Sequence, residues 1–146
     1  MEYKRLELLD LQLMLKFVDD ENTKYDVKNL TKFIEEKNNY GFIAKDNNKI
    51  IAFLYGYSLT HTDGKISFYL DAIDVMPEYQ NKGIGTKLMS FASSYIKELG
   101  CYEIFLVTNK SNKAACKCYE KAGFKNEATD DIVYVYNLEE DNSDRD

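Results

Sequence analysis

Two glycines and a lysine stand together in the segment QNKGIG, which spans residues 80–85. The residues before it, YLDAIDVMP, read as a strand and its end, and those after it place apolar side chains on one helical face. The first amide N–H groups of a helix lack partners within it and carry a partial positive charge, so they can bind phosphate oxygens. Glycine lets an anion approach the backbone, because it has no Cβ. The segment is therefore typical of a binding site for a phosphorylated ligand.

The spacing of these glycines excludes the two commonest nucleotide-binding loops. A Walker loop requires GxxxxGK followed by Ser or Thr, and this pattern occurs nowhere in the chain. A dinucleotide fingerprint would need a third glycine at position 88, where the chain has Leu88. A tight turn without a ligand is the alternative interpretation of Gly83 and Gly85. If the segment binds a ligand, it is a phosphate loop of another class.

A second segment of polar and aromatic residues follows one strand later. It reads NKAACKCYEKAGF over residues 112–124 and has the pattern of a helix that ends at Gly123. Together the two segments resemble the signatures of the GCN5-related N-acetyltransferase (GNAT) superfamily. These are Arg or Gln, two variable residues, Gly, one variable residue and Gly or Ala, and then N-x-x-A-x-x-x-Y-E-K-x-G-F. The resemblance covers residues 1–138. Within the superfamily the chain is also similar to small aminoglycoside 3-N-acetyltransferases, although it has QNK where they have Arg-Arg-Gln.

The resemblance implies acetyl-coenzyme A as the cofactor and indicates which residues bind it. The backbone of Ile73 and Val75 would hold the pantetheine arm as if it were an added strand, and the amides of residues 80–86 would hold the pyrophosphate. Lys82 could add a charge-assisted contact with phosphate. Asn112 would hydrogen-bond the cofactor or cap the helix that follows it. The expected cofactor-binding residues are Ile73, Val75, Gln80, Asn81, Lys82, Gly83, Ile84, Gly85, Thr86 and Asn112.

By the same resemblance, Tyr119 is the general acid that protonates the thiolate of coenzyme A as it leaves. A thiol has a pKa near ~8.5 and a tyrosine near ~10, so the thiolate is already a tolerable leaving group. The acid should therefore contribute only about 10²-fold to the rate. A tyrosine packed in the core is the alternative, in a chain with 12 tyrosines.

Asp71 and Asp74 lie in the strand before the loop and are expected to act on the attacking amine. An alkylamine with a pKa of ~10 is about one part in a thousand neutral at pH 7, so its proton must be removed. The odd separation of the two aspartates sends them to opposite faces of a regular strand, unless a β-bulge re-aims one. We prefer Asp71, because related polyamine acetyltransferases have an acidic residue at the matching position. It could orient the ammonium more than deprotonate it, and a surface aspartate without a role is the alternative. The acceptor site could further include Glu35, Glu36, Tyr69 and Asp130.

The elements that position these residues are expected to form one α/β (α+β) domain over residues 1–138. Its sheet would be mixed, mostly antiparallel and six- to seven-stranded, flanked by about four helices. Asp10 is expected to cap the first helix. Residues 139–146 would form an acidic, disordered tail. Strands are expected at 2–8, 40–45, 50–59, 66–75, 101–107 and 132–138, and the later helices at 27–36, 83–99 and 111–123.

Composition and charge exclude several classes of function. The net charge is −6, but residues 81–125 carry eight lysines and three acids, or +5, which leaves −11 for the rest. This pattern suits a local anion site and an acidic surface that attracts a cation, whereas a nucleic-acid binder would be broadly basic. The three cysteines lack the spacing of a zinc site, and His61 has no nucleophile motif, so neither a metal nor a hydrolase triad is expected. A charged N-terminus and the lack of an apolar run of ~20 residues predict a cytoplasmic protein without a membrane segment.

The sequence therefore predicts an N-acetyltransferase that moves acetyl from acetyl-CoA to a primary amine by direct attack. The expected acceptor is a small cationic molecule, such as an aminoglycoside-like compound or a polyamine. Acetylation of a protein lysine or N-terminus is the alternative reaction, and a CoA-binding module without turnover is the alternative class. The final segment, IVYVYNL, could also pair across a homodimer, as in this superfamily.

Overall fold

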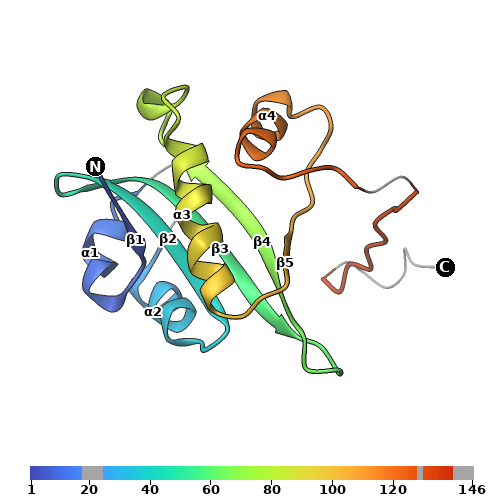
Figure 1. The fold of residues 1–146 in the computed structure, drawn as a ribbon. Coiled ribbons are helices and arrows are strands. Elements are labelled where there is room, and N and C mark those ends of the chain that lie inside the picture. The colour runs from blue at the N-terminus through green and yellow to red at the C-terminus, as the bar shows by residue number, and fades with distance from the viewer. Residues whose placement is uncertain (18–24, 128–129, 140–146) are drawn as a thin grey trace.

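The computed structural model describes residues 1–17, 25–127 and 130–139. Within these ranges, five strands form a single sheet in the order β1-β2-β3-β4-β5 (Figure 1). The strands are β1 (Glu2–Arg5), β2 (Asn39–Asp46), β3 (Lys49–Thr60), β4 (Ile66–Val75) and β5 (Glu103–Phe105). The helices are η1 (Leu8–Asp10), α1 (Leu11–Met14), α2 (Val27–Glu35), η2 (Pro77–Tyr79), α3 (Ile84–Glu98) and α4 (Lys113–Lys121).

The first four strands form an antiparallel meander, and β5 pairs with β4 in parallel. The turns of the two hairpins contain residues that tolerate a positive φ, namely Asn47 at +56° and Gly64 at +87°. The parallel pairing of β5 requires a crossover, and α3 provides it. The mixed, mostly antiparallel sheet is as predicted.

Helices α3 and α2 cover opposite faces of this sheet. The buried side chains of α3 recur at helical spacing, so that one stripe of the helix packs on the sheet. On the other face, the ring of Phe33 from α2 packs edge-on against the rings of Tyr55 and Tyr57 from β3. None of the helices in the described ranges is long and apolar enough to cross a membrane. The stripe of α3 consists of Ile84, Leu88, Met89, Ala92 and Ile96.

The predicted final strand at 132–138 is wrong, and five strands are found where six to seven were expected. Residues 132–138 join no sheet, and the chain after α4 runs away from the sheet (Figure 1). Their apolar side chains are exposed, with Ile132 72% and Tyr134 89% accessible. The residue types favour a strand, but strand preference depends on packing against a neighbour, and this conformation provides none in the sheet. Likewise β5 is shorter than the predicted 101–107. Residues 140–146 of the expected tail lie outside the described residues.

Asp10 does not cap the first helix. Its carboxylate is fully buried, accepts a hydrogen bond from the backbone amide of Glu7 at 2.9 Å, and pairs with the ammonium of Lys4 at 2.9 Å. The ammonium of Lys45 lies 3.9 Å from it. The local capping pattern is therefore overridden by ion pairs to β1 and β2, which fix the start of the chain on the sheet.

Replacing this aspartate should destabilise the fold. We expect Asp10→Ala to lower the free energy of unfolding by about 3 kcal/mol, because it leaves two partly buried ammonium groups without their counter-charge. Urea denaturation measures the change. Glu2→Ala removes a longer contact, 3.8 Å, between Lys45 and the exposed carboxylate of Glu2 and serves as the control, with an expected loss under ~1 kcal/mol. Equal losses in the two variants would contradict the importance of the buried carboxylate.

Candidate active site

The loop between β4 and α3 leaves the start of α3 open. Gly83 is the N-cap residue of α3 with φ +80°, and no side chain caps the helix there. A Cβ at Gly83 would have no atom within 4 Å, so the loop surface is accessible at this point. The first backbone bond of the helix runs from the amide of Lys87 to the carbonyl of Gly83. The amides of the first turn thus precede the helical ladder, as an anion site requires.

Gly85 and Gln80 hold this loop against the neighbouring elements. A Cβ at Gly85 would lie 3.2 Å from Sγ of Cys118 and 3.6 Å from Cγ2 of Val75, so glycine lets α3 approach both α4 and β4. The side-chain amide of Gln80 donates to the carbonyl of Val75 at 2.9 Å, which ties the loop to the end of β4. Asn81, with φ +62°, completes the turn. The second glycine therefore has a packing role that the sequence pattern did not reveal.

Strand β4 has an open edge beside this loop. Its ladder with β5 ends at the pair Tyr69 and Phe105, whereas β4 continues to Val75. Within the described part of the chain, residues 70–75 have no strand partner on that edge. An extended ligand arm could pair there as an added strand. The two expected backbone contacts, Ile73 and Val75, both lie in this open stretch.

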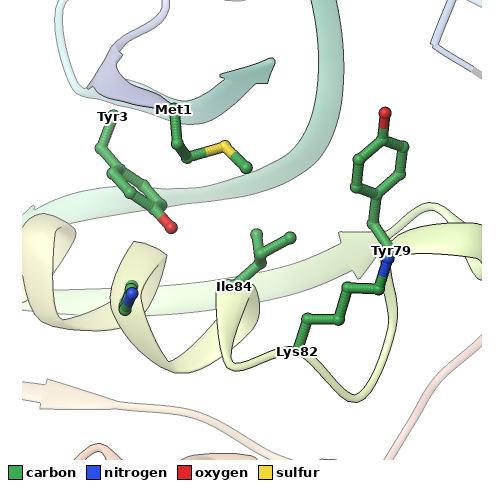
Figure 2. A pocket seen from close by; sticks show the side chains of 6 residues that line it. Met1, Tyr3, Tyr79, Lys82 and Ile84 are labelled. Carbon is green, nitrogen blue, oxygen red and sulfur yellow. The ribbon is translucent and has the colours of Figure 1, made fainter.

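A pocket of about 540 Å³ adjoins the loop on the β1 side of α3 (Figure 2). The ammonium of Lys82 lies 5.5 Å from the centre of the Tyr79 ring at one end of this pocket. Lys82 thus keeps a positive charge next to the open start of α3. The pocket is lined by Met1, Tyr3, Tyr79, Lys82, Ile84 and Lys87.

Helix α4 packs against α3 near the end of β4, because a Cβ at Gly85 of α3 would contact both Cys118 and Val75. The side chain of Asn112 caps α4 by accepting a hydrogen bond from the amide of Ala115 at 3.2 Å, as in the capping interpretation. Cys118 packs on α3, with its sulfur 3.7 Å from the hydroxyl of Thr86. The next residue, Tyr119, is partly buried.

The Tyr119 hydroxyl should stay protonated at neutral pH. Burial raises its pKa, and the neighbouring Cys118, Cys116 and Asp74 raise it further, while a hydrogen bond with Thr108 acts in the opposite direction. A protonated hydroxyl at this position can donate a proton to a leaving group.

A β-bulge in β4 places Asp71 and Asp74 on the same face of the sheet. Tyr55 pairs with Ala72 and the next residue of β3, Gly56, pairs with Leu70, so Asp71 is the extra residue. Asp74 is opposite Phe53, and the carboxylate of Asp71 accepts a hydrogen bond from the hydroxyl of Tyr57 at 2.9 Å. The expectation of opposite faces applied to a regular strand, which β4 is not at this point. The structure instead has the alternative that the sequence analysis named, a β-bulge that re-aims one of the two aspartates.

The residues around Asp71 form an aromatic surface that the sequence analysis missed, apart from Tyr69. The rings of Tyr57 and Tyr69 stack at 6.4 Å, and Tyr69 contacts Phe105 of β5 at 5.2 Å. Burial and the bond to Asp71 raise the pKa of Tyr57, so it remains a donor to this carboxylate. Alternating aromatic residues in β3 were the available signal. Of the other acceptor-site candidates, Glu35 and Glu36 lie exposed at the end of α2, and Asp130 lies exposed after α4.

The family model for the Acetyltransferase (GNAT) family matches residues 6–124 of this chain. The chain belongs to this family. It is an acetyl-CoA-dependent N-acetyltransferase, and the open start of α3 and the open edge of β4 fit the pyrophosphate and the pantetheine arm of that cofactor. The resemblance inferred from QNKGIG and the Tyr119 segment is thereby confirmed.

Relatives of this GNAT protein act on chemically different amines, judging by their names. N-alpha-acetyltransferase 30 of Schizosaccharomyces pombe is 29% identical over 123 residues, which cover 84% of this chain and 80% of the relative. Spermidine N(1)-acetyltransferase of Escherichia coli K12 is 27% identical over 94 residues, covering 64% of this chain and only 49% of that protein. A solved aminoglycoside acetyltransferase from an uncultured soil metagenomic sample, in complex with sisomicin, superposes with a TM-score of 0.76. It is 25% identical, and the match covers 95% of this chain and 96% of the other.

Proposed function

We propose that this GNAT enzyme acetylates a primary amine of a small cationic acceptor, such as a polyamine or an aminoglycoside-like compound. The observation that carries the proposal is the bulge at Asp71, which puts two carboxylates on one face beside the open edge of β4. Two carboxylates there would attract and hold an ammonium group. The names of the spermidine and aminoglycoside relatives are consistent with such acceptors.

Each site residue then has a distinct task. The bound cofactor supplies a thioester carbonyl that a neutral amine can attack. Asp71 binds and orients the ammonium, and the amine loses one proton through water to this carboxylate before it attacks. The new C–N bond would form as the C–S bond breaks, with Tyr119 giving its proton to the departing sulfur. The second proton that the nitrogen loses on becoming an amide would return through water to the Tyr119 oxygen. Asp74, on the same face of β4 as Asp71, adds a second negative charge to the acceptor side of the site.

Cofactor binding in this proposal depends mostly on the backbone. The amides of residues 80–86 bind the pyrophosphate, and the backbone of Ile73 and Val75 pairs with the pantetheine arm. Lys82 adds charge at the phosphates by leaving the Tyr79 ring. Asn112, which already caps α4, can still donate through its side-chain amide.

Thiol release from acetyl-CoA tests this function directly. The panel contains polyamines, aminoglycosides, lysine peptides and peptides with free N-termini, each at several salt concentrations. We expect release with the small polycations, and a rate that falls with salt, because opposite charges guide the encounter. Tight cofactor binding without release for any amine would instead indicate a non-catalytic module.

Acetylation of protein N-termini is the second candidate. It is favoured by the match to N-alpha-acetyltransferase 30, which extends over 84% of this chain. In the same panel, turnover confined to peptides with free N-termini would establish this alternative and reject the small-molecule acceptor.

Removing the charge of Asp71 should weaken acceptor binding selectively. We expect Asp71→Asn to lower kcat/KM for the amine about 10- to 100-fold, the effect of losing one charged hydrogen bond, with the KM for acetyl-CoA unchanged. The asparagine oxygen can still accept from Tyr57, so the local structure is kept. Asp63→Asn, at the exposed β3–β4 turn, is the matched control. If both variants kept wild-type kinetics, Asp71 would have no part in acceptor binding.

We further propose that the segment 132–138 pairs with a second copy of the chain to form a homodimer. Six of its apolar side chains are at least 69% exposed, which is unusual for a segment so rich in strand-forming residues. Light scattering should therefore give about twice the 17.0 kDa of one chain, and Val133→Asp with Val135→Asp should give the single mass. A monomer at micromolar concentrations of the unmodified protein would contradict this pairing. The six side chains are Ile132, Val133, Tyr134, Val135, Tyr136 and Leu138.

A further inference from the structure

A second cavity, of about 230 Å³, lies between α2 and β3. It opens on the face of the sheet that carries Asp71 and Asp74, because Phe53 of its lining is the cross-strand partner of Asp74. The proposed mechanism uses none of its residues. Four aromatic side chains line it, Tyr25, Phe33, Phe53 and Tyr55, together with Asp26, Asn29 and Leu30. We refer to the four aromatic residues as the aromatic cage.

The rings of the aromatic cage form a floor and two walls. Phe53 and Tyr55 stack with their centres 5.1 Å apart and an angle of 26° between their planes. Phe33 stands at 87° to Tyr55 at 5.9 Å, and Tyr25 stands at 77° to Phe53 at 6.1 Å. The faces of aromatic rings carry partial negative charge and attract cations, and such boxes suit alkylammonium groups.

The charge of the lining also favours a cation. Among the described residues that line it, there is one carboxylate, Asp26, and no basic side chain. Asp26 caps α2 by accepting hydrogen bonds from the amide of Asn29 at 2.7 Å and from its side chain at 2.9 Å. A carboxylate has about four acceptor positions, so it can still bind an ammonium. A purely apolar ligand group would offer no counter-charge to this carboxylate.

The distance from the aromatic cage to the reacting atoms follows from the sheet. Phe53 and Tyr55 are opposite Asp74 and Ala72 of β4, at the usual strand spacing of ~4.8 Å. The pantetheine arm is expected on the other edge of β4, another ~4.8 Å away. The thioester and the cage are therefore roughly 10 Å apart, which an extended chain spans with about eight single bonds at ~1.2 Å each.

We propose that the aromatic cage binds a second ammonium group of the acceptor, so that the preferred acceptors are alkyl diamines and longer polyamines. This inference rests on the proposed function and narrows its acceptor class. One amine reaches the thioester past Asp71 and Asp74, while another, about 10 Å along the chain, lies among the rings beside Asp26. The methylene groups between them lie on the aromatic surface of β3.

A series of α,ω-diamines with three to ten carbons tests the proposal, each compared with the monoamine of the same length. With the unmodified enzyme, we expect kcat/KM for the diamine to exceed that for the monoamine about tenfold, with the optimum near seven carbons. A diamine advantage that is absent at every length would overturn the proposal.

Two variants test whether the aromatic cage causes the preference for diamines. Phe33→Leu removes one wall, and Asp26→Asn removes the charge while keeping a good N-cap residue for α2. Each should reduce the ratio of diamine to monoamine kcat/KM about three- to tenfold. Tyr102→Leu, an exposed aromatic residue on the other side of the β3–β4 turn, should leave the ratio unchanged. If both cage variants kept the wild-type ratio of diamine to monoamine kcat/KM, the aromatic cage would not be the second ammonium site.

Direct binding separates this inference from the proposed function. If no amine supports thiol release, the acetylation of small amines is rejected. Calorimetry with the seven-carbon diamine and the CoA-bound protein then tests whether the aromatic cage binds an ammonium group. Binding that is weakened by both Phe33→Leu and Asp26→Asn would support the cation site. Equal binding of the diamine and its monoamine would overturn it.

Discussion

Tyr119→Phe should lower kcat about 10²-fold and leave the affinity for acetyl-CoA nearly unchanged. The substitution removes one hydroxyl and its proton, and general acids contribute 10²- to 10⁴-fold, with the low end expected for a thiolate leaving group. Stopped-flow thiol release gives kcat, and calorimetry with CoA gives the affinity. Tyr102→Phe, at an exposed residue just before β5, is a control that should behave as wild type.

The pH profile gives an independent test of Tyr119. Because burial raises the pKa of this hydroxyl above its ordinary value of about 10, the acid form persists at neutral pH. The alkaline fall of kcat in the wild type should therefore occur above pH ~10, and Tyr119→Phe should abolish that fall. Unchanged kcat in the variant would remove Tyr119 from the acid role.

Gly83→Val should weaken CoA binding at least 100-fold while the fold survives. The new side chain would fill the open space at the start of α3 and obstruct two or more charged hydrogen bonds from the loop amides, each about 1.5–3 kcal/mol. Circular dichroism checks the fold, and calorimetry with CoA measures the binding.

A valine at Gly64 provides a control for the backbone strain that valine causes at Gly83. Gly64 has φ +87° and, like Gly83, no atom within 4 Å of a Cβ position, but it lies in the β3–β4 turn. Both variants should lose about 1–2 kcal/mol of stability, because valine is strained in the left-handed region. Only the variant at Gly83 should lose CoA. Equal CoA affinity in the two variants would contradict the phosphate site.

Local patterns in the sequence predicted the elements on either side of the loop 80–85 well. The bounds of β4 coincide with the predicted 66–75, and α3 spans 84–98 where 83–99 was expected. Both elements have strong periodicity and are bounded by turn residues, so tertiary contacts only reinforce the local preference. The fold family followed from two short motifs in the right order.

The misses all involve contacts between distant segments. The pairing register that creates the bulge at Asp71 depends on β3, and the buried role of Asp10 depends on Lys4 and Lys45. The segment 132–138 has strand-forming residues, but a strand also needs a neighbour. The rings of the aromatic cage come from three stretches of chain, so no spacing pattern could indicate them.

A crystal structure with CoA bound most directly tests the central claim, that the backbone at the start of α3 binds the pyrophosphate. We predict pyrophosphate oxygens about 2.9 Å from amide nitrogens within residues 80–86, with the pantetheine arm along residues 73–75 of β4. A pyrophosphate bound elsewhere, for example in the pocket beside Tyr3 and Lys87, with these amides free of phosphate, would contradict the account.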